Sequence, residues 1–133
     1  MRSARKALPI FLKKKRYHDQ HCFRSGLYGA RAEAAYTASK NAVVGFTKNT
    51  GFMYAKEGIH CNAIAPDGVE TNISSSITSI SEMGMGHTQP GLALNPRNGK
   101  SEEIAKVALF LATADSSFVN GTVITADAGW TAY

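Results

Sequence analysis

The sequence contains no uninterrupted apolar run near the roughly 20 residues that a helix needs to cross a bilayer. Its basic start is not followed by an apolar segment with a small-residue cleavage site, so we expect no signal peptide. The two cysteines, Cys22 and Cys61, have neither metal-binding nor redox spacing and are too few for a disulfide framework. These absences predict a reduced, cytoplasmic protein with no membrane-spanning segment.

Acidic residues are scarce in the first part of the chain. Residues 1–31 hold nine Lys or Arg residues and one Asp, whereas the remainder has an acidic balance, and the net charge is +5. Such asymmetry can mark an arm that binds nucleic acid or a membrane. Because no aromatic residues alternate with these basic residues in a binding pattern, we favour a solvated or aberrant segment. We therefore predict no nucleic-acid or membrane partner.

Length and composition limit the chain to one domain. With 133 residues and 44% apolar content, it is long enough for one modest core and too short for two. We expect residues 1–133 to form a single incomplete domain. Its predicted parts are a basic, partly aberrant segment (1–31), a helix, strand and loop (33–73), a flap rich in Ser, Gly, Pro and Met (74–98), and a last helix, strand and tail (101–133).

The apolar pattern predicts alternating helices and short strands. Helical spacing indicates a helix over residues 4–14 and a long helix from Glu33 to Lys56, with Gly58 as its C-terminal cap. Short apolar runs at Ile59–Ala65 and Gly121–Ala126 indicate buried strands. This alternation is typical of an α/β layer fold with a parallel sheet.

The last helix is predicted to begin with Ser101 as its N-cap. Ile104 then occupies the third helical position, where a capping box requires an acid, so we expect only half of the box. Glu102 and Glu103 suit the positive end of the helix dipole.

Tyr36 and Lys40 carry the clearest chemical signal. They are four residues apart in the long predicted helix, so their side chains project from one face, about 6 Å apart along the axis. A tyrosine hydroxyl has a pKa of about 10, and a nearby ammonium lowers that pKa by favouring the phenolate. Such a pair can act as a general acid/base toward an alcohol or a carbonyl. Taken alone, the same spacing is typical of an ordinary exposed helix face.

The residues around this pair resemble a known family. The stretch AAYTASKNAVVGFTKNTGFMYAKEGIHCNAIAPDGVETNI (34–73) is similar to the catalytic helix, following strand and cofactor loop of classical short-chain dehydrogenases/reductases. EEIAKVALFLATADSSFVNGTVITADAGW (102–130) is similar to their last helix, last strand and oligomer-forming tail. The resemblance implies the C-terminal half of a doubly wound, Rossmann-like parallel sheet.

The resemblance also implies a reaction: the NAD(P)-linked interconversion of a small-molecule alcohol and a ketone, with NAD or NADP as cofactor. Tyr36 would exchange a proton with the reacting oxygen, and Lys40 would bind the nicotinamide ribose and lower the tyrosine pKa. The nicotinamide would be held by the loop after the strand, through Pro66, Gly68, the backbone of Val69 and the hydroxyl of Thr71. A homo-oligomer would form through the Tyr36 helix and the C-terminal tail.

Three departures from the family pattern predict an impaired or inactive chain. No G-x-x-x-G-x-G turn lies upstream of Tyr36, so we expect the dinucleotide-binding half to be missing. Asp67 follows Pro66 at a position where relatives usually have glycine, which permits positive φ and close backbone approach. Phe23 stands thirteen residues before Tyr36, where the family has its catalytic serine.

The segment from 15 to 25 has neither strand nor helix periodicity, and its residues 16–24 are too polar for the buried strand that the family has there. Codons for residues 16–25, read one base later, can spell Gly-Ile-Met-Ile-Asn-Ile-Ala-Ser-Val-Ala, with the serine opposite Phe23. We therefore interpret 15–25 as the product of paired frameshifts. In that case His18, His21 and Cys22 have no designed ligand role, and we predict no metal site.

Two alternatives stay open. The chain can be a non-catalytic remnant that retains only the oligomerisation surface, which saturable NADH binding would contradict. Binding of nucleic acid or membrane by residues 1–31 would instead show steep salt dependence and disappear when those residues are deleted.

Overall fold

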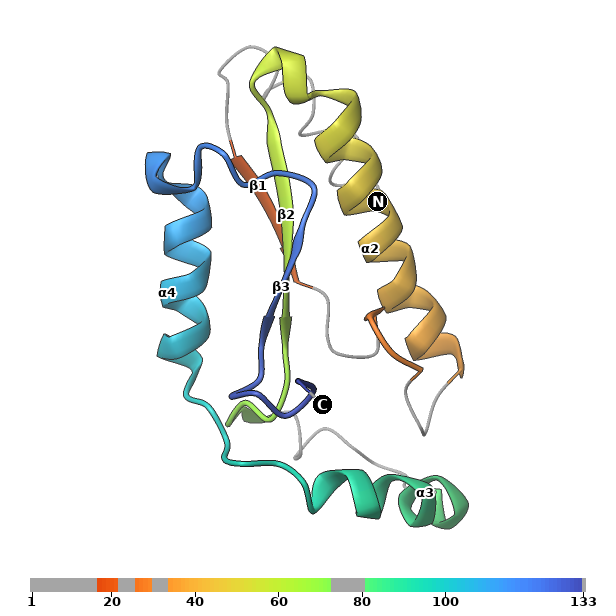
Figure 1. Ribbon diagram of the computed structural model, residues 1–133. Helices are drawn as coiled ribbons and strands as arrows, with labels where there is room; N and C mark the ends of the chain where they lie inside the picture. The colour runs from red at the N-terminus through yellow and green to blue at the C-terminus, as the bar shows by residue number, and fades with distance from the viewer. Residues whose placement is uncertain (1–16, 22–25, 30–33, 73–80, 133) are drawn as a thin grey trace.

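The computed structural model describes residues 17–21, 26–29, 34–72 and 81–132. A parallel sheet lies between two helices, α2 (Ala34–Met53) on one face and α4 (Ser101–Ala112) on the other (Figure 1). The order of the strands is β1 (Tyr17–His21), β2 (His60–Pro66) and β3 (Val123–Ala126), and both neighbouring pairs are parallel. The predicted α/β fold with a parallel sheet is confirmed.

The helix α2 carries the predicted catalytic pair. Its sequence has no proline, and it runs unbroken for 20 residues. It ends at Met53, and one 3-10 turn, η2 (Ala55–Glu57), completes the stretch that the sequence predicts as helix up to Lys56. Gly58 follows with a left-handed φ of 69°, which confirms the predicted C-terminal cap.

The strand β2 is the centre of the core. Its residues from Cys61 to Pro66 are buried, as expected for a parallel strand covered on both faces. On one face Ala63 and Ala65 are packed by Val43 and Val44 of α2. Because these alanines present only methyl groups, the helix lies close to the sheet.

Asn120 fixes the far end of α2 against the sheet. Its side-chain oxygen accepts a hydrogen bond from the Cys61 N–H (2.8 Å), and its amide nitrogen donates to the carbonyls of Gly51 (3.0 Å) and Ile59 (3.3 Å). One side chain thus joins the last turn of α2, the start of β2 and the turn before β3. This connection and the packing of Val43 and Val44 on β2 together hold α2, which carries Tyr36, against the sheet.

The interpretation of residues 16–24 as incompatible with a strand is wrong for the part of this segment that the structure describes. Tyr17–His21 form β1, which pairs in parallel with β2 from Tyr17 opposite His60 to His21 opposite Ile64. Ladder hydrogen bonds are made by backbone groups that every residue except proline carries, so tertiary neighbours can override a poor side-chain pattern. Cys22, Phe23 and the helix predicted over 4–14 lie outside the described residues.

The predicted start of the last helix is also wrong by one residue. Lys100, and not Ser101, is the N-cap of α4, so the third helical position belongs to Glu103. The Glu103 carboxylate accepts from the Lys100 N–H (2.9 Å), and the Glu103 N–H donates to the Lys100 carbonyl (3.0 Å). The Ser101 hydroxyl instead donates to the carbonyl of Glu70 (3.3 Å), a partner 31 residues away. Glu103 therefore supplies the acid that a capping box requires at the third helical position.

The predicted flap contains the helix α3 (Glu82–Leu92), whose N-cap Ser81 accepts a hydrogen bond from the Gly84 N–H. A short 3-10 turn, η4 (Ala114–Ser116), follows α4 and leads toward β3. Within the described residues, no helix is long and apolar enough to cross a membrane.

Candidate active site

Tyr36 and Lys40 meet on the surface of α2. Both side chains are partly buried, and the Lys40 Nζ lies 5.3 Å from the centre of the Tyr36 ring. A cation within about 6 Å of a ring centroid is attracted by the negative face of the ring. The spacing of four residues therefore brings the two groups together as predicted. Their catalytic roles stay a prediction.

The position of this pair matches that of ligand sites in parallel sheets. The chain runs along α2, turns at Gly58 and returns along β2, so the start of α2 and the end of β2 lie toward the same end of the molecule (Figure 1). In open α/β sheets, ligands bind beyond the carboxyl ends of the strands. The loop after β2, predicted to hold the cofactor, begins at that end.

The loop after β2 makes a tight turn at Gly68. Pro66 is buried at the end of the strand, and Gly68 adopts a left-handed conformation with φ of 63°. A Cβ on Gly68 would lie 3.0 Å from the Asn95 side chain, so both the left-handed conformation and the close approach of a neighbour favour glycine here. Val69 is partly buried, and Thr71 is exposed.

Asp67 fits the loop without needing the properties of glycine. Among the described residues other than glycine, only Ala128 has a positive φ, so the Asp67 backbone is not in the left-handed region. Its carboxylate accepts a hydrogen bond from the Gly68 N–H (2.9 Å), and its own N–H is directed to the Ala126 carbonyl at 3.4 Å. The aspartate therefore stabilises the turn that follows it.

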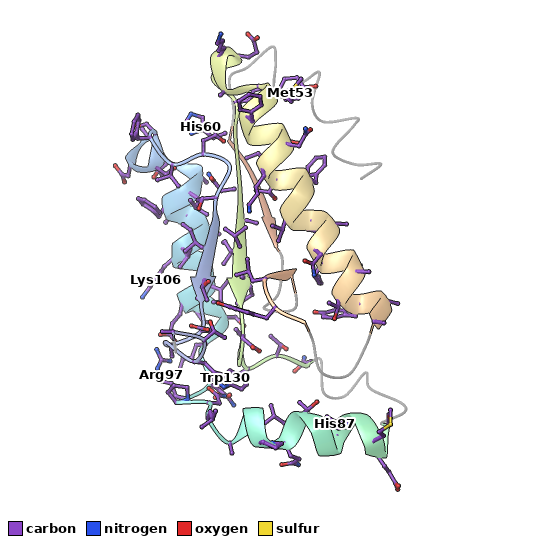
Figure 2. The ribbon with its side chains drawn as sticks, turned by 45° about the vertical axis from the view of Figure 1, so that its right-hand side comes forward. Met53, His60, His87, Arg97, Lys106 and Trp130 are labelled. Carbon is purple, nitrogen blue, oxygen red and sulfur yellow. The ribbon has the colours of Figure 1, made fainter. Side chains whose placement is uncertain are left out.

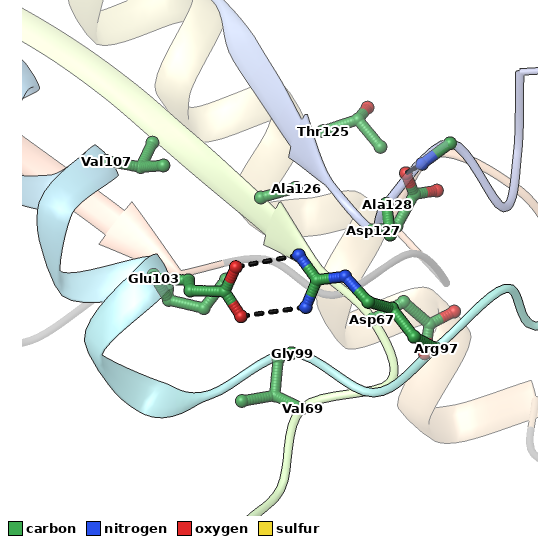
Figure 3. A pocket seen from close by; sticks show the side chains of 12 residues that line it. Asp67, Val69, Arg97, Gly99, Glu103, Val107, Thr125, Ala126, Asp127 and Ala128 are labelled. Carbon is green, nitrogen blue, oxygen red and sulfur yellow. Dashed lines mark hydrogen bonds and ion pairs between the residues drawn. The ribbon is translucent and has the colours of Figure 1, made fainter.

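A cavity of about 230 Å³ opens at the carboxyl ends of β2 and β3, beside the start of α4 (Figure 3). Asp67 and Val69 line it from the loop, and Asp127 lines it from the tail. The Asp127 carboxylate is already occupied, because it accepts from the Thr131 hydroxyl (2.6 Å) and from the N–H groups of Gly129 and Thr131. Tyr36 and Lys40 are not among the residues that line this cavity.

Arg97 and Glu103, which both line this cavity, form an ion pair that the sequence pattern did not reveal. The two guanidinium nitrogens donate to the two carboxylate oxygens at 2.7 and 2.9 Å (Figure 3). The Arg97 hydrogen bonds, together with the one from the Lys100 N–H, lower the pKa of Glu103 to about 2. The same carboxylate raises the pKa of Arg97. The pair joins the segment before α4 to the first turn of the helix, and no periodicity in the sequence indicates it.

The described residues contain no group of three or more His, Cys, Asp or Glu side chains placed to hold a metal ion. Cys61 is buried in β2.

Comparison with known proteins agrees with this geometry. A family model described as enoyl-(acyl carrier protein) reductase matches residues 2–131. The chain belongs to the short-chain dehydrogenase/reductase family. It is 50% identical over 109 residues to 3beta-hydroxysteroid dehydrogenase 2 of Eggerthella lenta, and the matched residues are 82% of this chain and 42% of that protein. It is also 42% identical over 115 residues to the short-chain dehydrogenase/reductase cdmF of Talaromyces verruculosus (80% of this chain, 45% of that protein).

Crystal structures of short-chain dehydrogenases/reductases share the fold. Levodione reductase is 32% identical with a TM-score of 0.83, over 98% of this chain and 53% of that one. A dehydrogenase from Agrobacterium tumefaciens, solved with bound NADP, is 32% identical with a TM-score of 0.77, over 92% of this chain and 50% of that one. The chain therefore spans about half the length of the relatives it matches, and it corresponds to the C-terminal half of their Rossmann-type fold.

Proposed function

We propose that this chain carries the proton-transfer part of an NAD(P)-linked oxidoreductase that interconverts a small-molecule alcohol and a ketone. The observation that carries the proposal is the Tyr36–Lys40 pair, with the ammonium 5.3 Å from the ring centre, at the start of α2. Membership of an oxidoreductase family supports the same reaction class.

In this proposal Tyr36 gives its hydroxyl proton to the carbonyl oxygen during reduction and takes it back during oxidation. Lys40 favours the phenolate of Tyr36 through its positive charge and donates a hydrogen bond to a ribose hydroxyl. A nicotinamide cofactor supplies or accepts the hydride when it is bound.

The loop after β2 fits the nicotinamide end of such a cofactor. The left-handed turn at Gly68 carries no side chain that would block a ligand, and Val69 and Thr71 follow it. A glycine-rich turn that could bind the pyrophosphate of the cofactor is absent from the sequence upstream of Tyr36. We therefore expect weak cofactor binding and slow or no turnover by this chain, with Phe23 in place of a serine as a further cause.

Titration of the full chain with NADH and NADPH, followed by nucleotide fluorescence, tests this proposal. We expect saturable binding in the wild type and in Tyr36→Phe, because the substitution removes only the hydroxyl. Where turnover is measurable, Tyr36→Phe should reduce kcat by about 10² to 10⁴, the usual contribution of general acid/base catalysis. Because a 50% identical relative is named as a hydroxysteroid dehydrogenase, 3-ketosteroids are the first substrates to assay. Absence of saturable nucleotide binding would refute the proposal.

The exposed face of α2 supports a second candidate function, a homo-oligomer formed through this helix. Of its 20 residues, only Thr47, Thr50 and Gly51 are buried in the described structure. Small residues lie on the exposed surface, namely Ala34, Ala35, Ala38, Ala42 and Gly45. Near the end of the helix, the Phe52 side chain is 81% exposed. Small side chains let two helices approach closely, so a second copy is the partner that we propose for this face.

Sedimentation of the wild type and of Ala38→Glu tests the oligomer. The glutamate should shift the protein toward the monomer, because it places an uncompensated charge in the contact. Ala105→Glu on the exposed side of α4 makes the same change on another helix and should leave the oligomer intact. A wild type that sediments as a monomer at all concentrations would exclude the contact.

A further inference from the structure

Two segments far apart in the sequence are joined beside the end of β2. The Gly99 N–H donates to the Gly68 carbonyl (2.7 Å), and the Gly99 carbonyl accepts from the Glu70 N–H (2.9 Å). These bonds form an isolated parallel bridge between Val69 and Gly99. The backbone of Gly99, in the segment that leads into α4, thus makes two of the hydrogen bonds that hold the loop after β2, and the Ser101 hydroxyl adds a third at the Glu70 carbonyl.

The Arg97–Glu103 pair holds both neighbours of that glycine. On one side, the Arg97 guanidinium donates to the carbonyl of Asn98 (3.2 Å). On the other side, the Glu103 carboxylate accepts from the N–H of Lys100 (2.9 Å). The same two side chains are bound to each other through two hydrogen bonds of 2.7 and 2.9 Å. Both peptide groups that flank Gly99 are therefore fixed by one bidentate ion pair.

We propose that Arg97 and Glu103 are positioning residues for the loop 67–71, and that they act on it through Gly99. Glycine is the most flexible residue in a chain, so a glycine that must present both its N–H and its carbonyl to a loop benefits from fixed neighbours. The inference rests on the proposed function, in which this loop holds the nicotinamide.

A simpler role for Glu103 is to stabilise the start of α4, as any acid in a first helical turn does. Glu102 lies in the same turn and is exposed, but the structure pairs Arg97 with Glu103. Glu102→Gln therefore removes the same charge from the same helix end and leaves the pair in place. It is the matched control for Glu103→Gln, which retains an oxygen for the Lys100 N–H and loses the charge.

Native-state amide hydrogen exchange of the full chain, measured by NMR, tests the inference directly. In Glu103→Gln and Arg97→Lys, the amides of Gly99 and Glu70 should exchange about two- to fivefold faster, the range that an exposed ion pair can supply. Arg97→Lys retains the charge but cannot make the bidentate contact. The Cys61 amide in β2 should not change in any variant. Unchanged exchange at Gly99 and Glu70, or an equal effect of Glu102→Gln, would overturn the inference.

Titration with NADH separates this inference from the proposed function. If the wild type binds NADH, Glu103→Gln and Arg97→Lys should each raise the Kd for NADH by about two- to fivefold, whereas Glu102→Gln should not change it. Faster exchange of the loop amides with unchanged NADH affinity would contradict a positioning role. If the wild type binds no NADH, the proposed function fails, and the exchange rates alone decide whether the pair positions the loop.

Discussion

The indole N–H of Trp130 donates a hydrogen bond to the carbonyl of Gly91, 2.9 Å away, and connects the C-terminal tail to the end of α3 (Figure 2). Trp130 is the only tryptophan in the chain and is 3% exposed. Gly91 is also buried, and its carbonyl accepts a second hydrogen bond from the Leu94 N–H (3.2 Å). The connection crosses from the last residues of the chain to the flap that follows the predicted cofactor loop.

Trp130→Phe should release the end of α3. Phenylalanine fills part of the space but cannot donate a hydrogen bond, so the Gly91 carbonyl retains only the bond from the Leu94 N–H. Loss of the indole hydrogen bond should cost about 0.5 to 1.5 kcal/mol. We expect faster proteolysis within α3 and a lower urea midpoint by circular dichroism. Phe118→Leu, at a fully exposed aromatic, is the control and should change neither. Equal cleavage rates in the wild type and Trp130→Phe would show that the indole does not hold α3.

The Arg97–Glu103 pair predicts a specific response to acid. Because the pKa of Glu103 falls from its ordinary 4.5 to about 2 in the folded chain, the stabilisation from this group is fully present above 4.5. It is lost as the pH falls through about 2, where the folded carboxylate takes up its proton. The urea midpoints of the wild type and Glu103→Gln should therefore differ by a constant amount at neutral pH and converge in acid. Because the pair is exposed, high salt should reduce the difference. A gap that widens in acid would contradict the assignment.

Two glycines of α2 should respond to the same substitution in opposite directions. A Cβ on Gly51 would lie 2.6 Å from the Gly121 Cα, a backbone atom that cannot rotate away, so Gly51→Ala should destabilise the fold by about 1 to 3 kcal/mol. At Gly45 a Cβ would meet nothing within 4 Å, and alanine there should stabilise the helix by about 0.5 to 1 kcal/mol. Urea unfolding followed by circular dichroism measures both changes. If the two variants unfold alike, the close contact between α2 and the turn before β3 is absent.

The gene sequence should record the origin of residues 15–25. If paired frameshifts produced this segment, codons 16–25 read one base later will spell the apolar strand that ends beside a serine. Replacing residues 16–25 with that shifted sequence should raise the urea midpoint, because β1 is covered by helices on both faces and each fully buried aliphatic side chain contributes about 1.5 to 3 kcal/mol. The single substitution Phe23→Ser is the control for the serine alone. Codons that cannot encode the shifted strand would exclude the frameshift.

Several features of this protein follow from short stretches of sequence. Tyr36 and Lys40 share a helix face because residues four apart always do so in an α-helix, and Gly58 ends the stretch because few other residues adopt a left-handed conformation easily. The buried strand β2 is evident from its apolar run. Each of these depends on neighbours in the chain, which the sequence shows directly.

Other features required the tertiary structure. The polar residues of β1 form a strand because β2 supplies backbone partners for them. Lys100 is the N-cap of α4, with its N–H bonded to the Glu103 carboxylate, while the Ser101 hydroxyl donates to the carbonyl of Glu70. The bonds that hold the loop after β2 join residues about 30 positions apart, such as Gly68 and Gly99. Backbone groups are the same in every residue and carry no pattern of their own. The sequence alone therefore determined that Tyr36 and Lys40 share one face of α2, whereas only the folded chain decided which segments hold the loop after β2.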